Sequence, residues 1–368
     1  MDKPLIIAYY LPQYHPIPEN DEWWGKGFTE WTNVAKAKPL FKGHYQPKIP
    51  ADLGFYDLRV PEVREQQAEL AREAGIDGFC YWHYWFGNGK ELLERPFKEV
   101  VKSGKPDFPF CLGWANESWE AKIWNSNAVK SKKILIQQTY PEKDDIEKHF
   151  YSLIDAFKDK RYMKINNQPI FLIYQPLNHP NISYFIERWN TLIQKEKIAE
   201  KFFFIAGADD QNYTKMKELG FSAANITLSK RIEEYYKKQN ILSRAFKYFI
   251  RLVLQRPLLI KYENALNYLW KQRTDTNEFV IPSLLPNWDH SPRSGKSAAI
   301  LTNSTPQLFE KLCLKVFDGI KNKQNKIIFI KSWNEWGEGN YMEPDLRYGK
   351  GFIKALASAK NHLFHNQV

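Results

Sequence analysis

The stretch KIIFIKSWNEWGEG, Lys326 to Gly339, decides how this chain is expected to fold. It begins with a short apolar run, Lys326–Ile330, of the kind that forms a parallel strand covered on both faces. Two glycines then permit a tight turn that the strand itself could not make. The turn presents Glu335 and Glu338 at the carboxyl end of a strand, where α/β proteins usually carry out their chemistry. An isolated pair of this kind is more often a polar turn with one Glu capping a helix, so the rest of the chain has to decide.

Apolar runs like this one alternate with helical patterns along the whole chain. Eight runs are expected to be strands: Leu5–Tyr10, Gly78–Trp82, Phe108–Gly113, Pro169–Tyr174, Phe202–Ala206, Phe221–Asn225, Glu278–Ser283 and Ile327–Lys331. The helical stretches between them include Val63–Ala74, Asp144–Lys158, Ile182–Lys195, Tyr213–Leu219 and Pro306–Ile320. Pro61 and Gly75 are suitable residues to begin and end the first of these helices. The sequence therefore predicts an α/β fold of the (β/α)8 TIM-barrel class.

A doubly wound open sheet is the alternative fold. It normally carries a Gly-rich phosphate loop after its first strand, and the sequence has none. We therefore expect one catalytic domain over residues 1–368 with two interruptions. The first, Gln13 to Tyr56, is a long loop after the first strand, rich in Pro, Gly and Trp, and loops of this length are usually functional. The second is a basic helical insertion over about residues 230–273.

Positive charge is concentrated in this insertion. The chain carries a net charge of +11, and residues 230–273 contain eleven Lys or Arg against three Glu. Because no basic stripe runs through the aromatic clusters elsewhere, nucleic-acid binding is not expected. Within the insertion, Arg244–Leu254 places cations every three or four residues beside a broad apolar face. Two interpretations stay open: a helix that contacts a membrane surface or a protein partner, and an ordinary helical hairpin packed on the barrel.

Several classes of protein and chemistry have no support in the sequence. Cys80, Cys111 and Cys313 are far apart in apolar contexts and are expected to be reduced core residues. The amino terminus shows no cleavable signal, and no apolar run approaches the roughly 20 residues that span a bilayer, so a cytoplasmic, at most membrane-peripheral protein is expected. The histidines show no HxH or HxxxH spacing, and neither a GxSxG motif nor a phosphate loop occurs. Neither a metal nor another cofactor is expected.

Aromatic and polar side chains gather after most of the expected strands. Aromatic residues make up 15% of the chain, and flat aromatic faces suit the C–H faces of sugar rings. Singly, each residue has a plainer explanation; His83, for example, is of a kind more often found hydrogen-bonded in a core. Because the strand ends of a barrel share one cleft, their recurrence predicts a site for a hydroxyl-rich ligand. Beside the Glu335 and Glu338 pair, the candidate binding residues are Tyr9, Tyr10, Gln13, His15, Glu30, Trp31, Trp82, His83, Tyr84, Trp114, Asn116, Glu117, Tyr174, Trp288, Asp289, Asn334 and Trp336.

Five motifs stand out as a set. They are AYYLPQYH (Ala8–His15), GFTEW (Gly27–Trp31), GFCYWHYW (Gly78–Trp85), WANE (Trp114–Glu117) and WNEWGEG (Trp333–Gly339). Together they resemble the WbsX-like family, which occurs in bacterial O-antigen and other surface-polysaccharide gene clusters and is described as glycosyltransferases. That family is related in turn to glycoside hydrolase family 99, the endo-acting α-mannosidases and mannanases. The match covers nearly the whole chain.

The resemblance implies a (β/α)8 barrel with a metal-independent, retaining mechanism on a bacterial surface polysaccharide. In the hydrolase relatives, an EWxEG motif supplies a base for the sugar 2-hydroxyl and an acid/base for the leaving oxygen. Glu335 and Glu338 occupy these two positions. Gly337 departs from the hydrolase pattern, in which this residue is often His, and the basic insertion is a second departure. Burial among Trp333, Trp336 and the tyrosines of the first strand is expected to raise the pKa of the acid, Glu338.

Three functions stay open from the sequence. The first is glycan cleavage by a retaining glycoside hydrolase, with Glu338 as acid/base and Glu335 as base. The second is glycosyl transfer or transglycosylation during polysaccharide biosynthesis, although a sugar-nucleotide transferase ordinarily has a Rossmann-like fold and often a DxD-type metal site. The third is a non-catalytic, lectin-like barrel. In each case, the expected partner is an oligo- or polysaccharide.

Overall fold

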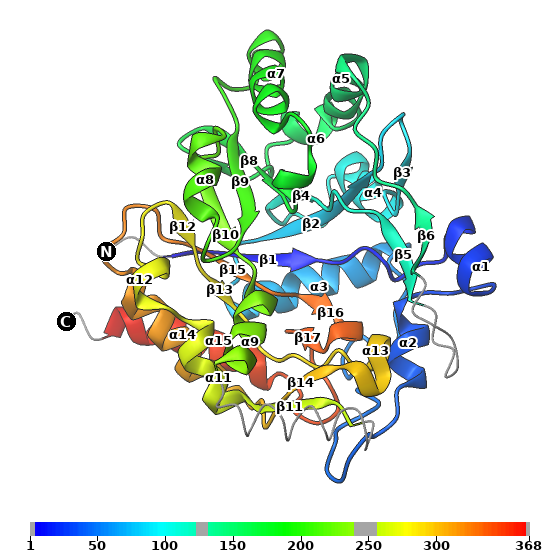
Figure 1. Ribbon diagram of the computed structural model, residues 1–368, viewed down its shortest axis with the longest axis vertical. Helices are drawn as coiled ribbons and strands as arrows, with labels where there is room; N and C mark the ends of the chain where they lie inside the picture. The colour runs from blue at the N-terminus through cyan, green and yellow to red at the C-terminus, as the bar shows by residue number, and fades with distance from the viewer. Residues whose placement is uncertain (1–3, 123–131, 239–255, 366–368) are drawn as a thin grey trace.

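Nine strands, all parallel, ring the centre of the computed structural model, which describes residues 4–122, 132–238 and 256–365 (Figure 1). In ring order they are β12 (Val280–Ile281), β10 (Ala223–Ile226), β9 (Phe203–Ala208), β8 (Gln168–Ile173), β4 (Phe110–Trp114), β2 (Gly78–Trp85), β1 (Leu5–Tyr10), β15 (Ile327–Ile330) and β13 (Ser283–Leu284). Two short strands, β3 (Glu91–Leu92) and β7 (Lys164–Ile165), pair with β2 and β8 outside the ring.

The ring closes through Pro282, which separates β12 from β13. Proline has no N–H, so the strand is interrupted at this residue. β12 pairs with β10 on one side and β13 pairs with β15 on the other. The N–H of Phe329 donates to the carbonyl of Pro282 at 3.0 Å, which bridges the interruption. The two pieces act as one barrel strand, so the predicted (β/α)8 barrel is confirmed, with all eight expected strand regions in it.

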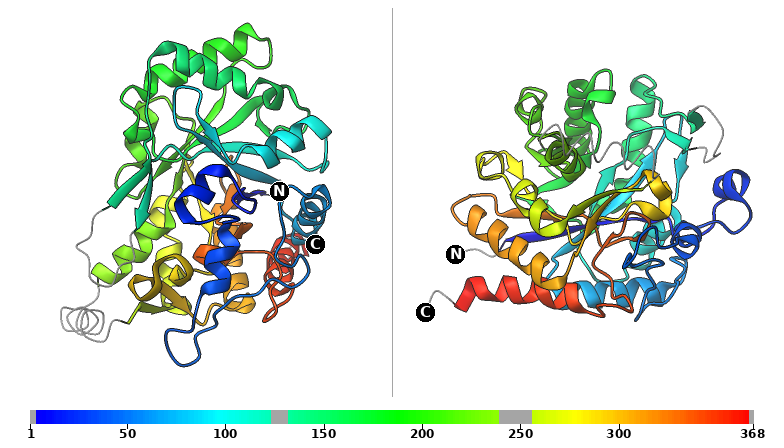
Figure 2. Two further views of the ribbon diagram at one scale, coloured as in Figure 1. Left: turned by 90° about the vertical axis from the view of Figure 1, so that its right-hand side faces the viewer. Right: turned by 60° about the horizontal axis from the view of Figure 1, so that its bottom comes forward.

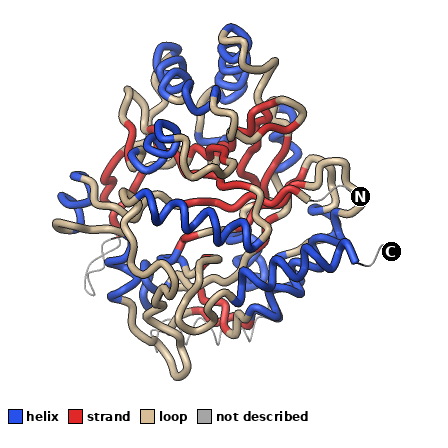
Figure 3. The backbone as a smooth tube through the Cα atoms, turned by 180° about the vertical axis from the view of Figure 1, so that it is seen from behind, coloured by secondary structure: helices blue, strands red, loops and turns tan. Residues whose placement is uncertain are grey.

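Helices cover the outside of the ring (Figure 3). Those that pack around the strands are α3 (Pro61–Ala74), α4 (Arg95–Ser103), α5 (Lys143–Ser152), α6 (Ile154–Lys158), α7 (Ile182–Lys195), α8 (Tyr213–Glu218), α14 (Pro306–Ile320) and α15 (Gly351–His365). As expected, Pro61 begins α3, and Gly75 ends it in the left-handed region with φ of +79°. The single helix predicted over Asp144–Lys158 is instead broken at Leu153, whose backbone (φ −111°, ψ 4°) leaves the helical region.

The long loop and two smaller elements cover the carboxyl ends of the strands. The loop folds into α1 (Pro18–Trp24) and α2 (Glu30–Lys36). Beside them lie an antiparallel hairpin, β5 (Trp119–Lys122) with β6 (Lys132–Ile136), and the short helix α13 (Ser291–Ser294). The left view of Figure 2 looks onto this end, with α1 and α2 in front. These elements form the walls around the carboxyl end of the barrel, where α/β-barrel enzymes carry their active sites.

The described parts of the basic insertion pack on the barrel. They are α9 (Leu228–Lys237), α11 (Tyr262–Leu269), α12 (Gln272–Asp275) and β11 (Leu258–Lys261), which pairs with β14 (Ala299–Thr302). Arg231 is buried and lies 2.6 Å from Asp210 and 2.7 Å from Asp275, so one of the basic residues stabilises the fold. The helix expected over residues 244–254 lies outside the described residues, and its contact with a membrane or partner stays a prediction. In the described part of the chain, no helix is long and apolar enough to cross a bilayer.

Candidate active site

Both glutamates of the opening stretch lie on a tight turn after β15. The turn consists of β16 (Asn334–Glu335), a 3-10 turn (Trp336–Glu338) and β17 (Asn340–Tyr341). Gly339 follows Glu338 in the left-handed region, with φ of +65°. The carbonyl of Glu338 accepts a hydrogen bond from the N–H of Asp289 at 2.7 Å. The N–H of Trp336 donates to the Tyr14 hydroxyl at 3.1 Å, so the backbone of the turn is held from both sides.

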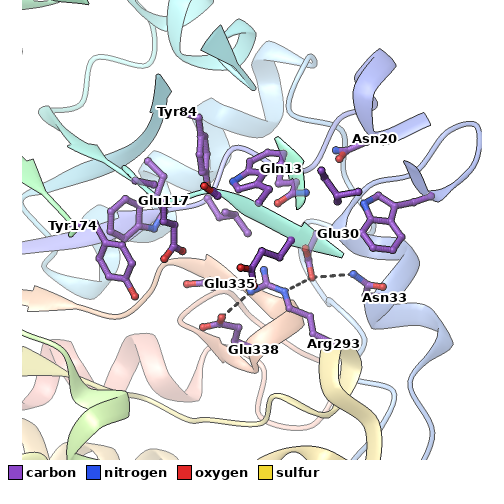
Figure 4. Close-up of a pocket in the computed structure, with 18 of the residues that line it drawn as sticks. Gln13, Asn20, Glu30, Asn33, Tyr84, Glu117, Tyr174, Arg293, Glu335 and Glu338 are labelled. Atoms are coloured by element: carbon purple, nitrogen blue, oxygen red, sulfur yellow. Dashed lines mark hydrogen bonds and ion pairs between the residues drawn. The ribbon is translucent and has the colours of Figure 1, made fainter. Parts of the chain in front are cut away.

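Two cations, Arg293 and Lys331, hold the carboxylates of the turn together; Figure 4 shows Arg293 between Glu338 and Glu30. Nη1 of Arg293 lies 2.7 Å from Glu338 and 3.4 Å from Glu335, and its Nε lies 2.8 Å from Glu30. Nζ of Lys331 lies 3.4 Å from Glu338 and 3.5 Å from Glu335. We call these three glutamates and two cations the floor cluster. Among the described residues, no group of three or more His, Cys, Asp or Glu side chains is arranged to hold a metal ion.

The surroundings of Glu335 and Glu338 shift their pKa values in opposite directions. Burial raises the pKa of Glu335, and repulsion from Glu338 raises it further, against the attraction of the two cations. Burial acts on Glu338 in the same direction. The neighbouring Lys331, Arg293 and His290 outweigh it and hold the pKa of that carboxyl below its usual range. The expectation of a raised pKa at Glu338 is therefore wrong, because the sequence did not reveal these cations.

Gly337 leaves room for the carboxylate of Glu30. A β-carbon built on Gly337 would lie 1.8 Å from Oε1 of Glu30 and 2.9 Å from Nε of Arg293. No side chain fits at this position while Glu30 and Arg293 keep their ion pair. The departure of this residue from the hydrolase pattern therefore has a physical reason in this chain: the ion pair fills the space that a side chain would take.

The floor cluster lies in an open cleft of about 770 Å³, within the usual size range of ligand sites. The structure brings these predicted site residues together along its walls and floor: Gln13, Glu30, Trp82, Tyr84, Glu117, Tyr174, Glu335 and Glu338. They come from strand ends far apart in the sequence and from the long loop. Figure 4 shows Tyr174 and Glu117 on one side of Glu335, and Asn20 and Asn33 on the other.

A further set of residues lines the cleft that was not among the candidate site residues. They are Leu11, Asn20, Trp24, Phe28, Asn33, Ala115, Ser118, Trp119, Glu120, Leu135, Asn178, Arg293 and Lys331. Lys331 directly precedes the turn motif, and Ser118 and Trp119 directly follow WANE, so proximity to a motif was a usable signal for these. Arg293 had no such signal, because it lies on a helix of four residues outside every recognised motif.

The remaining predicted site residues do not line the cleft: Tyr9, Tyr10, His15, Trp31, His83, Trp114, Asn116, Trp288, Asp289, Asn334 and Trp336. Strand geometry explains the positions of Tyr9 and Tyr10, since neighbouring side chains on a strand point to opposite faces. Tyr10 points outward and donates to Gln67 at 2.6 Å. Tyr9 points inward but lies beneath the cleft, stacked on Trp82 with 4.7 Å between ring centroids. His83 is buried, with Nε2 2.8 Å from Nε2 of His149.

The other corrected residues hold the loops that carry the site. Trp336 is fully buried and donates through its indole N–H to Glu343 at 2.6 Å. Four of the others hydrogen-bond to backbone carbonyls: His15 Nδ1 to Pro12 (3.0 Å), Trp31 to Tyr56 (2.8 Å), Trp114 to Trp85 (2.9 Å) and Asn116 to Gln175 (2.8 Å). Asp289 accepts a hydrogen bond from the side chain of Gln46 at 2.7 Å, and Asn334 accepts one from the N–H of Leu11 at 2.8 Å. The ring of Trp288 lies beneath the ammonium group of Lys331, 5.6 Å from it. These residues support the cleft from behind, because each of them satisfies a buried polar group of a strand end or loop.

Sequence comparison identifies the family. The family model for the glycosyltransferase WbsX matches residues 6–356. The chain belongs to the WbsX glycosyltransferase family. A relative, the uncharacterized protein WxcX of Xanthomonas campestris pv. campestris, is 34% identical over 369 residues. The aligned region is 96% of this chain and 49% of WxcX, so the chain spans about half the length of this relative.

Solved structures show the same barrel. A glycoside hydrolase-like protein superimposes with a TM-score of 0.61 at 13% identity, covering 98% of this chain and 94% of the other. The GH99 endo-alpha-mannosidase from Bacteroides thetaiotaomicron gives a TM-score of 0.56 at 13% identity, covering 98% and 97%. At this level of identity, the likeness establishes the fold that WbsX family members share with GH99 enzymes, and no more.

Proposed function

We propose that this chain is a carbohydrate-active enzyme that cleaves a glycan, with Glu335 and Glu338 as its acid/base pair. The observation that carries the proposal is geometric: Glu335 and Glu338 line one cleft at a strand end, and Arg293 and Lys331 lie within 3.5 Å of both carboxylates. Their surroundings also displace the two carboxyl pKa values in opposite directions. Neighbouring titratable groups with pKa values pushed apart are typical of acid/base catalysis. Aromatic side chains such as Trp82, Tyr84 and Tyr174 line the same cleft and suit a sugar ring.

The proposed reaction is metal-independent retaining hydrolysis assisted by the sugar 2-hydroxyl. Glu335 takes the proton of the 2-hydroxyl as the 2-oxygen attacks the anomeric carbon. Glu338 gives a proton to the leaving oxygen as the glycosidic bond breaks. In the second step, Glu338 takes a proton from water, which attacks the anomeric carbon and breaks its bond to the 2-oxygen, and Glu335 returns a proton to the released 2-oxygen. Two inversions leave the anomeric configuration unchanged, and a single proton on the pair serves both steps.

Substrate contacts supply the proton arrangement that this reaction needs. The first step begins with the proton on Glu338, whereas burial raises the pKa of Glu335 and the neighbouring cations lower that of Glu338. A 2-hydroxyl that donates a hydrogen bond to Glu335 stabilises the charged form of that carboxyl. A leaving oxygen that accepts a hydrogen bond from Glu338 stabilises its protonated form. Both contacts therefore move the proton in the direction of reaction.

Release of reducing ends tests the proposal. We propose a bacterial surface polysaccharide of the O-antigen type as substrate, so the assay uses a panel of such polysaccharides together with α-mannan, on the precedent of the endo-alpha-mannosidase. Glu335→Gln and Glu338→Gln are each expected to lower the rate by about 10²–10⁴-fold. The matched control is Glu73→Gln, since Glu73 pairs with Lys350 on the surface at 2.6 Å, and it should keep wild-type activity. Equal activity of Glu338→Gln and the wild type would refute the assignment.

Glycosyl transfer is the second candidate, and the family description as a glycosyltransferase favours it. The same carboxylate pair would serve if an acceptor hydroxyl replaced water in the second step. A transferase that uses activated donors has to bind a sugar nucleotide. Calorimetric titration with UDP- and GDP-sugars separates the candidates: tight binding supports transfer from such donors, and its absence favours hydrolysis or transglycosylation.

A further inference from the structure

The part of the cleft that lies beyond the floor cluster is built by α1 and α2. Trp24 ends α1 and is 44% exposed, although it is among the largest apolar side chains of the protein. Its ring lies 5.9 Å from that of Phe28, and both line the cleft. The N–H of Phe28 donates to the carbonyl of Gly25 at 3.2 Å, and the N–H of Gly27 to Asp21 at 2.8 Å. The chain between the two helices is thus folded back on itself, and Trp24 is presented to the cleft by a hydrogen-bonded turn.

Asn20 lines the same part of the cleft and has an unusual environment. The residue is 0% exposed, yet neither its side-chain oxygen nor its side-chain nitrogen has a hydrogen-bond partner among the described residues. A buried amide without partners is unfavourable for folding, and such groups in native proteins call for an explanation. Figure 4 places Asn20 at the end of the cleft away from Tyr174, with Glu335 between them. The donor and the acceptor of this amide are therefore left without protein partners at this end of the cleft, among the described residues.

Residues around Asn20 have the chemistry of a sugar subsite. The side chains of Gln13 and Asn33 line the same end of the cleft. Planar amides pair with neighbouring hydroxyl groups, since one group donates while the other accepts. An exposed indole face binds the C–H face of a sugar ring. An apolar ligand would leave the Asn20 amide unsatisfied, so the combination favours a hydroxyl-rich ring.

We propose that Asn20 and Trp24 form a distal subsite that binds a neutral sugar unit of the same glycan chain, away from the bond at Glu335 and Glu338. Trp24 stacks on the ring, and Asn20 hydrogen-bonds to its hydroxyl groups. This deepens the proposed function, because it makes an oligosaccharide chain, and not a single sugar, the ligand of the cleft. It also gives a reason for the long loop, whose residues supply the subsite.

Binding measurements on a Glu338→Gln chain test the subsite without depending on cleavage. The chain is first applied to a printed array of bacterial surface polysaccharides. Oligosaccharides of one to six units, cut from the strongest binder, are then titrated by calorimetry. Asn20→Leu and Trp24→Ala are compared in this background. The matched control is Phe55→Ala, because Phe55 is an aromatic residue of the same loop that is 52% exposed and does not line the cleft.

The subsite predicts a dependence on chain length that each variant removes. Chains of three or more units should bind about tenfold more tightly than a single unit, and Asn20→Leu or Trp24→Ala should each weaken chain binding about five- to tenfold. Binding of the single unit and the Phe55→Ala control should match the parent. Asn20→Leu should also raise Tm by about 1–3 °C, since it removes an unsatisfied buried amide.

Two results would overturn the proposal. One is unchanged chain binding in Asn20→Leu and Trp24→Ala, which would make Asn20 a structural residue only. The other is the absence of any array glycan that binds the parent chain. If Glu335 and Glu338 proved not to be catalytic, a positive binding result would still hold. The two proposals can therefore be refuted independently of each other.

Discussion

Replacing Arg293 by Gln is expected to add a loss of stability between pH 5 and pH 8 that the wild type does not show. Arg293 lies within 3.4 Å of Glu335 and 2.7 Å of Glu338, and it also pairs with Glu30. Without it, three carboxylates face one another, with Lys331 and His290 left to balance them. The pKa of Glu335, already raised, should then rise further, and that of Glu338 should rise above its value in the unfolded chain.

The size of the effect follows from the distances. Two unit charges about 4 Å apart interact by about 4 kcal/mol at an effective dielectric constant of 20, which corresponds to about 3 pKa units. A carboxyl with a raised folded-state pKa binds its proton more strongly in the folded than in the unfolded chain. The protein therefore loses stability as the pH rises from the unfolded-state pKa towards the folded-state pKa. At pH 5 the variant takes up protons and relieves the repulsion, whereas at pH 8 it cannot. We expect Arg293→Gln to lose about 2–3 kcal/mol more at pH 8 than at pH 5, roughly 3–4 °C in Tm for a chain of this length.

Thermal unfolding of the wild type and the variant at both pH values measures this difference. The control is Arg59→Gln, because Arg59 pairs with Asp57 at 2.6 Å on the surface, with 40% of its side chain exposed. An exposed pair contributes at most about 1 kcal/mol, and its loss should be the same at both pH values. If Arg293→Gln lowers Tm equally at pH 5 and pH 8, the electrostatic account of the floor cluster is wrong.

Three other predictions concern residues next to or beneath the site. Gly337→Ala should lower the free energy of unfolding by about 1–3 kcal/mol, because its β-carbon would lie 1.8 Å from Oε1 of Glu30. In a Glu30→Ala chain the same substitution should cost much less. Equal losses in the two chains, measured by urea unfolding, would exclude this clash. Burial lowers the pKa of His83 to about 3 and that of His149 well below its ordinary value of 6.5, so stability is lost as pH falls below 6.5. The midpoint of urea unfolding should fall less for His149→Gln than for the wild type when the pH is lowered from 6.5 to 4. Burial raises the pKa of Glu343 from 4.5 to about 7, so stability falls as pH rises through that window, and Glu343→Gln should flatten this part of the plot of Tm against pH.

The barrel itself was predictable because its signals are local. Each strand region is a short apolar run, and each of the predicted helices shows its own period, so neither depends on distant residues. The errors occur where local patterns compete with tertiary contacts. One helix was expected over residues 144–158, but the chain breaks at Leu153, and no residue of helix-breaking type marks that position. The strand-end rule also admitted Tyr10 and His83, which are next to cleft residues in sequence but point to buried partners.

The sequence by itself determined the family, the barrel and the position of Glu335 and Glu338 at a strand end, because all three are written in contiguous motifs. Only the tertiary structure decided which of the two carboxyl pKa values is raised and which is lowered. That choice depends on Arg293, which reaches Glu30 across 263 residues of sequence, and on Lys331, whose role becomes apparent only when the turn folds back over it. A pKa is set by every charge within a few ångströms and by exclusion of water. Such neighbourhoods are assembled from several loops at once, so no single stretch of sequence contains them.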